Sequence, residues 1–265
     1  MYLDSYGLKS TPFNITSDPN FFYEGSSHKE GLGALLYGIK ERKGIILITG
    51  EVGTGKTTLC KTLLNKLPPN VKTSLILNPY FSEVQLLQAI VEDFGLEAKG
   101  KNRLAIIKEL NKFLVNISLA GSNAVLIIDE AQNLSSRQLE QVRLLSNLET
   151  SQDKLLQIVL SGQPELTQKL DKFELRQLRQ RIFVKYNLVP LKENEVKEYV
   201  EFRLRRAGAV QIDVLPESYK IIYEFSKGVP RLINMLCDRA LLLGFVKEKN
   251  IFDGEIFESC VEDLR

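Results

Sequence analysis

The sequence has 265 residues, of which 44% are hydrophobic and 26% are charged, a composition that is typical of folded globular proteins and excludes disordered and fibrous classes. Its 35 Lys and Arg residues nearly balance its 33 Asp and Glu residues. The formal net charge of +2 therefore predicts no strong positive electrostatic potential that would bind nucleic acid or anionic lipid. The single histidine, His28, excludes multi-histidine metal sites.

The cysteine pattern and the apolar segments indicate where the protein works. Cys60, Cys237 and Cys260 are far apart and form no CxxC pair, so they favour a reducing compartment and most simply belong to the core. No segment reaches the roughly 18 consecutive apolar residues of a membrane-spanning helix, and the amino terminus lacks the layout of a signal peptide. We therefore expect a soluble, cytoplasmic protein.

Strand and helix patterns alternate through the first 190 residues. Short β-branched apolar runs predict strands, and apolar residues at helical spacing predict the helices between them. The predicted strands are residues 45–49, 73–77, 125–128, 156–160 and 182–188, and the predicted helices are residues 57–67, 82–94, 103–119 and 135–149. This alternation predicts an α/β fold: a parallel five-stranded sheet sandwiched by helices and connected by right-handed crossovers.

The character of the sequence changes after Pro190. Strand patterns disappear, and helical patterns run to the end of the chain at residues 193–207, 216–227, 230–247 and 254–264. We therefore predict a core domain of residues 1–190 and a small all-α second domain of residues 191–265.

A glycine-rich segment lies between the first predicted strand and helix and matches the phosphate-binding pattern G-x-x-x-x-G-K-[ST] in full. It reads Gly50, Glu51, Val52, Gly53, Thr54, Gly55, Lys56, Thr57, and Thr58 follows it. The glycines allow backbone N–H groups to converge on an anion, and the positive end of the helix points to the same place. We expect Lys56 to reach the β and γ phosphates and the Thr57 hydroxyl to ligate magnesium. The alternative is a glycine-rich turn that binds nothing.

Two acids follow the apolar run of residues 125–128. We expect Asp129 to hold magnesium, directly or through water, and Glu130 to polarise the attacking water as general base. The alternative is a pair of solvated acids at a strand end. Paired acids at this point favour hydrolysis over transfer of a phosphoryl group to another molecule.

Polar residues also end the fourth predicted strand, at Ser161-Gly162-Gln163-Pro164. Of these, Gln163 is preferred over Ser161 as the side chain that contacts the γ-phosphate or orients the lytic water. The alternative is a turn residue before Pro164.

Arginines gather before the fifth predicted strand and recur in the second domain. Arg176, Arg179 and Arg181 suit either an arginine that completes a neighbouring subunit's site or a solvated helix end that complements the helix dipole. The dipole explanation is preferred for the group Arg203, Arg205 and Arg206. Arg231, at a helix start, favours an anionic partner such as a nucleotide phosphate, the alternative being a surface or ion-paired arginine. His28 is interpreted as a surface or capping residue.

The order of six motifs resembles the AAA+ ATPases, and more narrowly the ExeA type, the general secretion pathway protein A family, with its relatives among transposition-regulator and exopolysaccharide-associated ATPases. The motifs are YGLKSTPFNITSDPNFFY, GEVGTGKTT, VLIIDEAQNL, VLSGQPEL, LRQLRQRI and GVPRLINMLCDRAL. The resemblance covers nearly the whole chain, and it implies a P-loop NTPase core followed by a helical lid, with ATP or ADP and Mg²⁺ bound.

The resemblance also implies roles for single residues. Gln163 takes the sensor-1 position, Arg181 is the first choice for the arginine finger with Arg179 second, and Arg231 takes the sensor-2 position. Phe13, with Pro12, is expected to pack near the adenine.

Assemblies of such ATPases are rings or filaments, commonly hexameric, and the resemblance implies work on a secretion channel or related envelope structure, peripheral to the inner membrane. We therefore expect an ATPase that converts ATP and water to ADP and phosphate and so drives assembly or remodelling of a protein complex. The alternative is an ATP-controlled filament on DNA, of the transposition-regulator kind. ExeA-type proteins usually continue into a transmembrane segment and a peptidoglycan-binding domain, so this sequence is expected to be a stand-alone relative or a fragment.

Overall fold

The computed structural model describes residues 2–98, 102–150 and 153–264. Met1 and Arg265, the outer ends of the two predicted domains, lie outside the described residues. The described residues fall into two compact units. The helical unit comprises residues within 1–29, 52–58 and 189–265, and the sheet unit comprises residues within 30–51 and 59–188.

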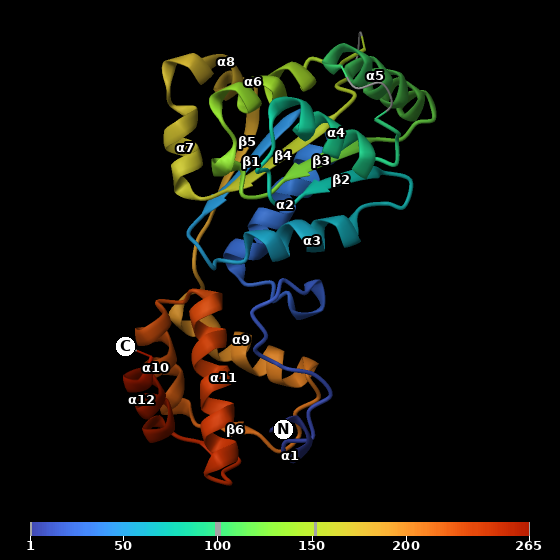
Figure 1. The fold of residues 1–265 in the computed structure, drawn as a ribbon. Coiled ribbons are helices and arrows are strands. Elements are labelled where there is room, and N and C mark those ends of the chain that lie inside the picture. Colours follow the sequence, from blue (N-terminus) through green and yellow to red (C-terminus); the bar gives the residue numbers. More distant parts are fainter. Residues whose placement is uncertain (1, 99–101, 151–152, 265) are drawn as a thin grey trace. The chain divides into compact units, whose positions relative to one another are not determined.

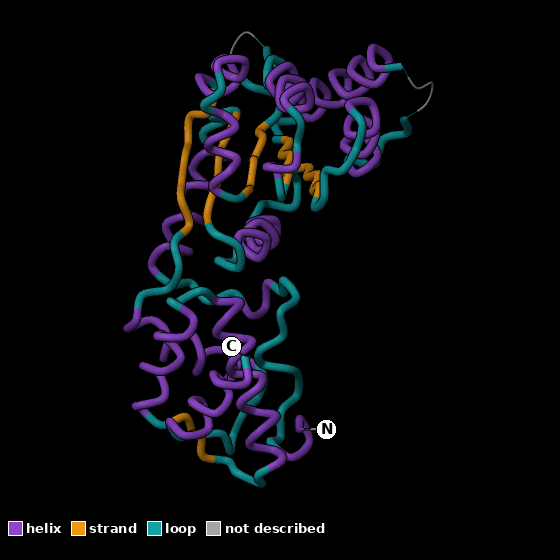
Figure 2. The backbone as a smooth tube through the Cα atoms, turned by 60° about the vertical axis from the view of Figure 1, so that its left-hand side comes forward, coloured by secondary structure: helices purple, strands orange, loops and turns teal. Residues whose placement is uncertain are grey.

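The sheet unit is built on five parallel strands (Figures 1 and 2). They are β1 (Ile45–Gly50), β2 (Lys72–Ile76), β3 (Ala124–Ile128), β4 (Gln157–Gly162) and β5 (Ile182–Leu188). Their order in the sheet is β2-β3-β4-β1-β5. The predicted five-stranded parallel sheet is therefore confirmed, with strand limits that differ from the predicted ones by a few residues.

Helices cover both faces of this sheet (Figure 1). They are α2 (Ser26–Lys40), α3 (Lys56–Lys66), α4 (Glu83–Asp93), α5 (Arg103–Leu119), α6 (Ser136–Leu145), α7 (Pro164–Leu170) and α8 (Arg176–Gln180), with short 3₁₀ turns at Ala131–Asn133 and Phe173–Leu175. Capping boxes at Ser82 and Ser135 fix the starts of α4 and α6. The helix predicted to reach residue 149 stops at Leu145, and the Ser146 hydroxyl bonds the Arg143 carbonyl there.

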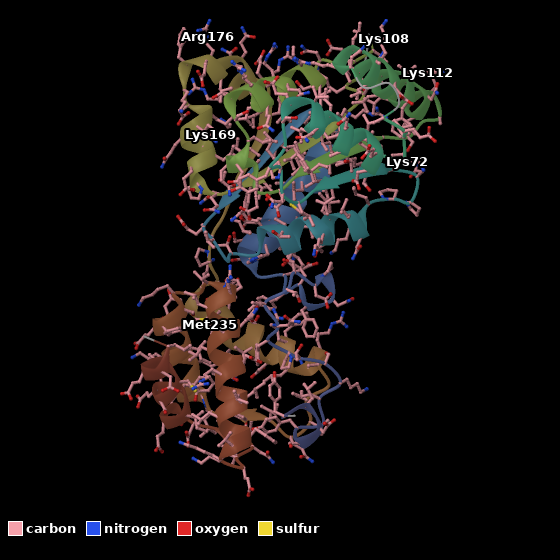
Figure 3. All side chains as sticks on the ribbon, viewed as in Figure 1. Lys72, Lys108, Lys112, Lys169, Arg176 and Met235 are labelled. Atoms are coloured by element: carbon pink, nitrogen blue, oxygen red, sulfur yellow. The ribbon has the colours of Figure 1, made fainter. Side chains whose placement is uncertain are left out.

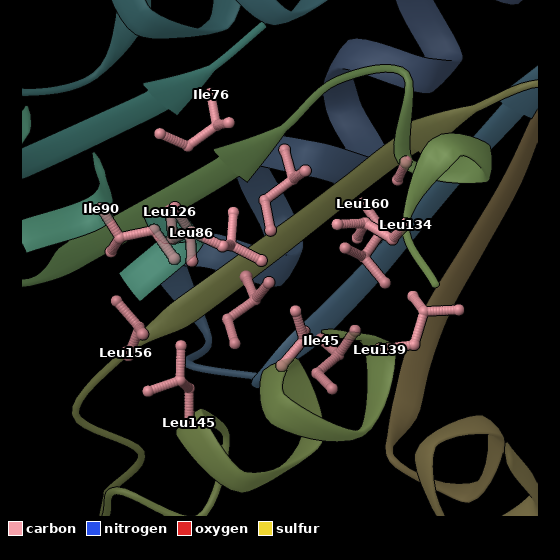
Figure 4. Packing of buried hydrophobic residues seen from close by; sticks show 14 of the residues in the cluster. Ile45, Ile76, Leu86, Ile90, Leu126, Leu134, Leu139, Leu145, Leu156 and Leu160 are labelled. Carbon is pink, nitrogen blue, oxygen red and sulfur yellow. The ribbon is translucent and has the colours of Figure 1, made fainter. Parts of the chain in front are cut away.

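Alternate residues of the central strands face opposite sides of the sheet. Ile45, Leu126 and Leu160 join one apolar cluster with residues of α4 to α8, and Figure 4 shows Leu86 and Ile90 of α4 beside Leu126. On the other face α2 packs so closely that a Cβ added to Gly38 would lie 2.6 Å from Ile46 Cδ1. Because both faces are covered, β1, β3 and β4 are buried along their whole length and read as largely apolar runs, which is why the sequence reveals them.

The helical unit contains four longer helices, as predicted. They are α9 (Glu193–Arg206), α10 (Pro216–Ser226), α11 (Pro230–Val246) and α12 (Gly254–Asp263), accompanied by α1 (Tyr2–Ser5) and a 3₁₀ turn at Pro19–Phe21. Strands do not disappear entirely after Pro190, because β6 (Asp213–Val214) pairs in parallel with β7 (Ile251–Phe252). Two-residue strands are too short to leave a periodic pattern in the sequence.

The amino-terminal segment belongs to the helical unit, and a buried arginine holds it there. Arg203 of α9 donates to the carbonyl oxygens of Pro12 (2.5 Å) and Asn14 (3.1 Å) and to the Tyr199 hydroxyl (2.9 Å). Arg203 lies in the last turn of α9, as the dipole interpretation expects, but its side chain is also buried, with its donors bonded to carbonyl groups and a hydroxyl. Arg205, by contrast, is exposed and pairs with Glu201 at 3.5 Å.

The three cysteines are free and buried, as the sequence predicts. Within the described part of the chain, no helix combines the length and the apolar character needed to cross a membrane.

Candidate nucleotide-binding site

The carboxyl edge of the parallel sheet collects the ends of the strands that carry the motifs. β1 and β3 both pair with β4, so Gly50 and Glu51 at the end of β1, Asp129 after β3, and Ser161 at the end of β4 lie along one edge. Ligands of open α/β sheets bind at this edge, where the loops after successive strands meet.

The glycine-rich loop continues directly from β1 and has the backbone conformation that its glycines allow. Gly53 (φ +81°) and Gly55 (φ +97°) are left-handed, and Lys56 is the first residue of α3 and only 6% exposed. The loop therefore presents successive peptide N–H groups at the start of an 11-residue helix, which is the arrangement that favours an anion.

Arg231 lies beside this loop within the helical unit. It follows Pro230 in the first turn of α11, and its backbone N–H donates to the Gly53 carbonyl at 3.3 Å. A Cβ added to Gly53 would lie 2.8 Å from Arg231 Cβ, so only glycine permits this approach. The sequence alone did not predict that the loop and the start of α11 are in contact.

Asp129 is buried and has a fixed orientation. Its Oδ1 accepts a 2.7 Å hydrogen bond from the Ser161 hydroxyl, and its backbone N–H donates to the Ile76 carbonyl at 2.8 Å. The Ser161 side chain, the lesser candidate in the sequence, therefore holds this carboxylate in place. Carboxylate and hydroxyl oxygens are the donors that Mg²⁺ prefers, so Asp129 and Thr57 suit that ion. Among the described residues no group of three or more His, Cys, Asp and Glu side chains could hold a metal.

Glu130 follows Asp129 in a left-handed backbone conformation, with φ 50° and ψ 36°. Its Oε2 accepts hydrogen bonds from the Gln132 Nε2 at 2.5 Å and from the Gln163 Nε2 at 3.3 Å. The structure therefore brings the sequence-predicted pair Glu130 and Gln163 into contact. Both amides donate to the carboxylate, which leaves its other oxygen, Oε1, outside these two bonds.

Gln132 is a component of this cluster that the sequence analysis missed. Its Oε1 accepts from the Gln163 backbone N–H at 3.1 Å, while its Nε2 donates to Glu130. A Cβ on Gly162 would lie 2.9 Å from that Oε1, so the glycine makes room for the amide. Lys169 Nζ, labelled on α7 in Figure 3, donates to the carbonyls of Gln132 and Leu134 and holds the turn against α7.

The arginines before β5 differ in their surroundings. Arg179 pairs with Asp171 at 2.9 Å, and Arg176 lies 3.9 Å from the centre of the Phe173 ring. Arg181 is the C-cap residue of α8 and is half-buried. It lies close enough to Glu140 to affect that carboxyl: hydrogen bonds from Arg143 are the main cause that lowers the pKa of Glu140, and the charge of Arg181 adds to this effect. Arg181 is thus near acidic groups of its own chain.

Phe13 is buried in the apolar core of the helical unit, with only 2% of its surface exposed. Thr58 is the third residue of α3. The predicted adenine contact of Phe13 and the predicted nucleotide contact of Thr58 stay predictions.

Comparisons with known proteins agree with this architecture. Residues 39–170 match the family model of the AAA domain. The chain is 44% identical over 265 residues to general secretion pathway protein A of Aeromonas hydrophila, and the match covers 99% of this chain and 48% of that protein. The chain thus spans about half the length of this curated relative.

Solved structures share the fold at low sequence identity. Aeropyrum pernix ORC2 in its ADPNP–ADP complexes has a TM-score of 0.69 at 17% identity, covering 93% of this chain and 72% of that chain. The Thermotoga maritima RuvB Holliday junction branch migration motor has a TM-score of 0.61 at 19% identity, covering 89% and 69%. The motifs, the sheet order and these matches agree. The chain belongs to the AAA+ P-loop ATPases of the ExeA type, the type that includes general secretion pathway protein A.

Proposed function

We propose that the chain binds ATP with Mg²⁺, hydrolyses ATP to ADP and phosphate, and uses this cycle to drive assembly or remodelling of a protein complex in a secretion or cell-envelope system. The observation that carries the proposal is the arrangement around Glu130. A left-handed conformation is unfavourable for a glutamate, and two glutamine amides hold its carboxylate beside Asp129. Residues held in an unfavourable backbone conformation cluster at active sites and switch regions.

Each residue of the site has a distinct task in this proposal. The backbone N–H groups of Gly53 to Thr58 and the Lys56 ammonium hold the β and γ phosphates, and Thr57 and Asp129 hold Mg²⁺. The bound ion would neutralise charge on the phosphate oxygens. Glu130 takes a proton from the attacking water, and Gln163 orients that water or the γ-phosphate.

Other residues complete the nucleotide site in the proposal. Arg231 supplies a positive charge from the start of α11, and its contact with Gly53 supports this role. Phe13 packs near the adenine. In functional terms we divide the chain into an ATPase core of residues 1–190 and a helical lid of residues 191–265.

We further propose that the active form is a homo-oligomer, a ring or filament and possibly a hexamer, in which Arg181, or else Arg179, enters a neighbouring copy's site. The biological role rests on the name of the relative, which places that protein in general secretion. We propose that this chain acts in the cytoplasm, peripherally at the inner membrane, on a protein partner of the secretion or envelope system.

Two substitutions at the proposed site test hydrolysis. Lys56→Ala removes the phosphate contact and should abolish ATP binding, whereas Glu130→Gln preserves size and should keep ATP binding while slowing hydrolysis by at least about 10²-fold. ATP affinity and phosphate release, measured on the same preparations, separate the two effects. Turnover like the unmodified protein's in both variants would contradict the site.

Duplex DNA is the informative additive in the same assay. Exposed lysines such as Lys108 and Lys112 lie on one face of α5 (Figure 3), but the net charge of +2 is small for a protein that coats DNA. We expect little stimulation of turnover by DNA. A large stimulation that is lost steeply on adding salt would replace the protein-remodelling role by the DNA-filament role.

A further inference from the structure

His28 is a buried group that the proposed site does not use. It is the third residue of α2, and only 4% of its surface is exposed. The interpretation of His28 as a surface or capping residue is therefore wrong. Its environment within the helical unit is the glycine-rich loop on one side and the Phe22 ring, at 5.8 Å between ring centres, on another.

The hydrogen bond of His28 fixes its tautomer. Nε2 lies 2.8 Å from the Thr54 carbonyl oxygen, and a carbonyl can only accept, so Nε2 carries the proton and donates. Burial lowers the pKa of His28, although the Thr54 carbonyl and the Glu195 charge act in the opposite sense. The ring is therefore neutral near pH 7, with a bare Nδ1 that has no hydrogen-bond partner among the residues that the structure describes.

The bonded carbonyl belongs to a peptide whose other side faces away from the histidine. In the trans peptide between Thr54 and Gly55, the C=O and N–H groups point in opposite directions. A carbonyl drawn toward His28 therefore turns the Gly55 N–H to the opposite side of the loop. Gly55 is left-handed, and a Cβ there would lie 3.2 Å from His28 Nε2, so the ring packs directly against the loop.

This geometry has an energetic consequence for anion binding. A peptide whose carbonyl already accepts a hydrogen bond is polarised, and its N–H becomes a better donor. An N–H fixed in direction also loses less conformational freedom when it binds an anion. Both effects act on Gly55, which lies immediately before Lys56 in the phosphate-binding pattern.

We propose that His28 is a positioning residue for phosphate binding: its Nε2–H holds the Thr54 carbonyl and thereby directs the Gly55 N–H toward the nucleotide phosphates. The proposal rests on the proposed nucleotide-binding function. His28 contacts no phosphate in it and acts only through the loop.

Two substitutions separate the hydrogen bond from the volume of the ring. The amide nitrogen of Gln reaches about as far as Nε2, whereas that of Asn reaches about as far as Nδ1. ADP affinity is measured by titration calorimetry on the full chain with Mg²⁺, alongside the thermal unfolding midpoint. We expect His28→Asn to weaken ADP binding about tenfold, and His28→Gln to stay within about threefold of the unmodified protein.

The unmodified protein supplies a readout that does not depend on any variant folding. Nitrogen NMR of protein labelled at histidine distinguishes the two neutral tautomers, and it has only one histidine to report. We expect the Nε2–H tautomer with and without ADP. An Nδ1–H tautomer, which places no proton on Nε2, would overturn the proposal.

The outcomes distinguish this proposal from the proposed function. If the unmodified protein binds neither ADP nor ATP, the nucleotide function itself is wrong. If it binds ADP and His28→Asn binds equally tightly, or if His28→Gln and His28→Asn weaken binding to the same extent, the positioning role of the Nε2–H is wrong.

Discussion

Glu130 has an unfavourable left-handed backbone conformation, which contacts with neighbouring residues must stabilise. A non-glycine residue in the left-handed region costs about 1–3 kcal/mol and persists only when surrounding contacts hold it. Gln132 and Gln163 supply these contacts through their side-chain amides, and Lys169 fixes the carbonyl of Gln132. The carboxylate is thus held by one local contact, from Gln132 two positions further on, and by one long-range contact, from Gln163.

Gln132→Ala tests this arrangement at the residue scale. It removes the shorter of the two amide contacts to Glu130 and the acceptor for the Gln163 N–H, so we expect the rate of hydrolysis at saturating ATP to fall about 10- to 100-fold. ADP affinity should stay within about twofold. Steady-state kinetics and ADP titration check the two statements.

Gln168→Ala is the matched control, because it makes the same chemical change at an exposed position of α7. It should leave the rate and the affinity unchanged. Equal losses of rate and of ADP affinity in Gln132→Ala would show a general disturbance instead of a positioning effect.

The sequence reveals the residues whose roles follow from local spacing, and it misses those that act through the fold. The positions of Lys56, Thr57, Asp129 and Glu130 follow from a loop pattern and an apolar strand, which are local. The contact of Gln132 with residues of the β4 end requires the sheet order, which no single segment contains. A polar side chain two positions after the acidic pair is the one signal in the sequence that could have pointed to it.

At the scale of elements, the amino-terminal segment is attached to the helical unit by polar groups from α9. The Glu195 carboxylate accepts from the backbone N–H of Ser26 at 2.6 Å and of Lys192 at 2.9 Å, so it joins the start of α2 to α9 and caps α9 itself. Arg203, further along α9, donates hydrogen bonds to the carbonyl oxygens of Pro12 and Asn14. These bonds join residues far apart in sequence, so helical periodicity could not predict them.

Acid should weaken this attachment through Glu195. Burial acts to raise its pKa, but the N–H groups of Ser26 and Lys192 lower it on balance. A lowered carboxyl pKa stabilises the folded state above the unfolded-state value of about 4.3, and this contribution is lost as the pH falls through the folded-state pKa. We expect Glu195→Gln to reduce the free energy of unfolding at pH 7 by about 1–2 kcal/mol and to flatten its loss below pH 4.

Urea unfolding at pH 7 and at pH 3.5, followed by circular dichroism, measures both effects. Glu193→Gln, an exposed change at the first residue of the same helix, serves as the control. Equal slopes of stability against pH in the protein with and without Glu195→Gln would contradict the assignment.

At the scale of the whole molecule, the five strands and the four longer helices of the helical unit were predictable because burial imposes periodic patterns on their sequences. The two-residue strands β6 and β7 and the early end of α6 were not, since hydrogen bonds of single residues decide them. Surface arginines carry even less local information. Arg181 and Arg179 lie two positions apart, yet Arg179 pairs with Asp171 and Arg181 caps α8.

The proposed oligomer makes a prediction that depends on two copies of the chain. If Arg181 completes a neighbour's site, turnover per chain should rise with protein concentration. Arg181→Ala should then lower that turnover about 10³-fold while ADP affinity stays unchanged. Arg176→Ala, a change at an exposed arginine over the Phe173 ring, is the control and should keep both properties.

Mixing two inactive variants tests the sharing of residues directly. Arg181→Ala keeps Glu130, and Glu130→Gln keeps Arg181, so a mixed assembly contains some sites that have both groups although neither variant alone has any. We expect the mixture to recover a measurable fraction of turnover, with a maximum near equal amounts. Because a residue acting within its own chain cannot complement another chain, a mixture as inactive as its components, together with turnover independent of protein concentration, would refute the role of Arg181 in a neighbouring site.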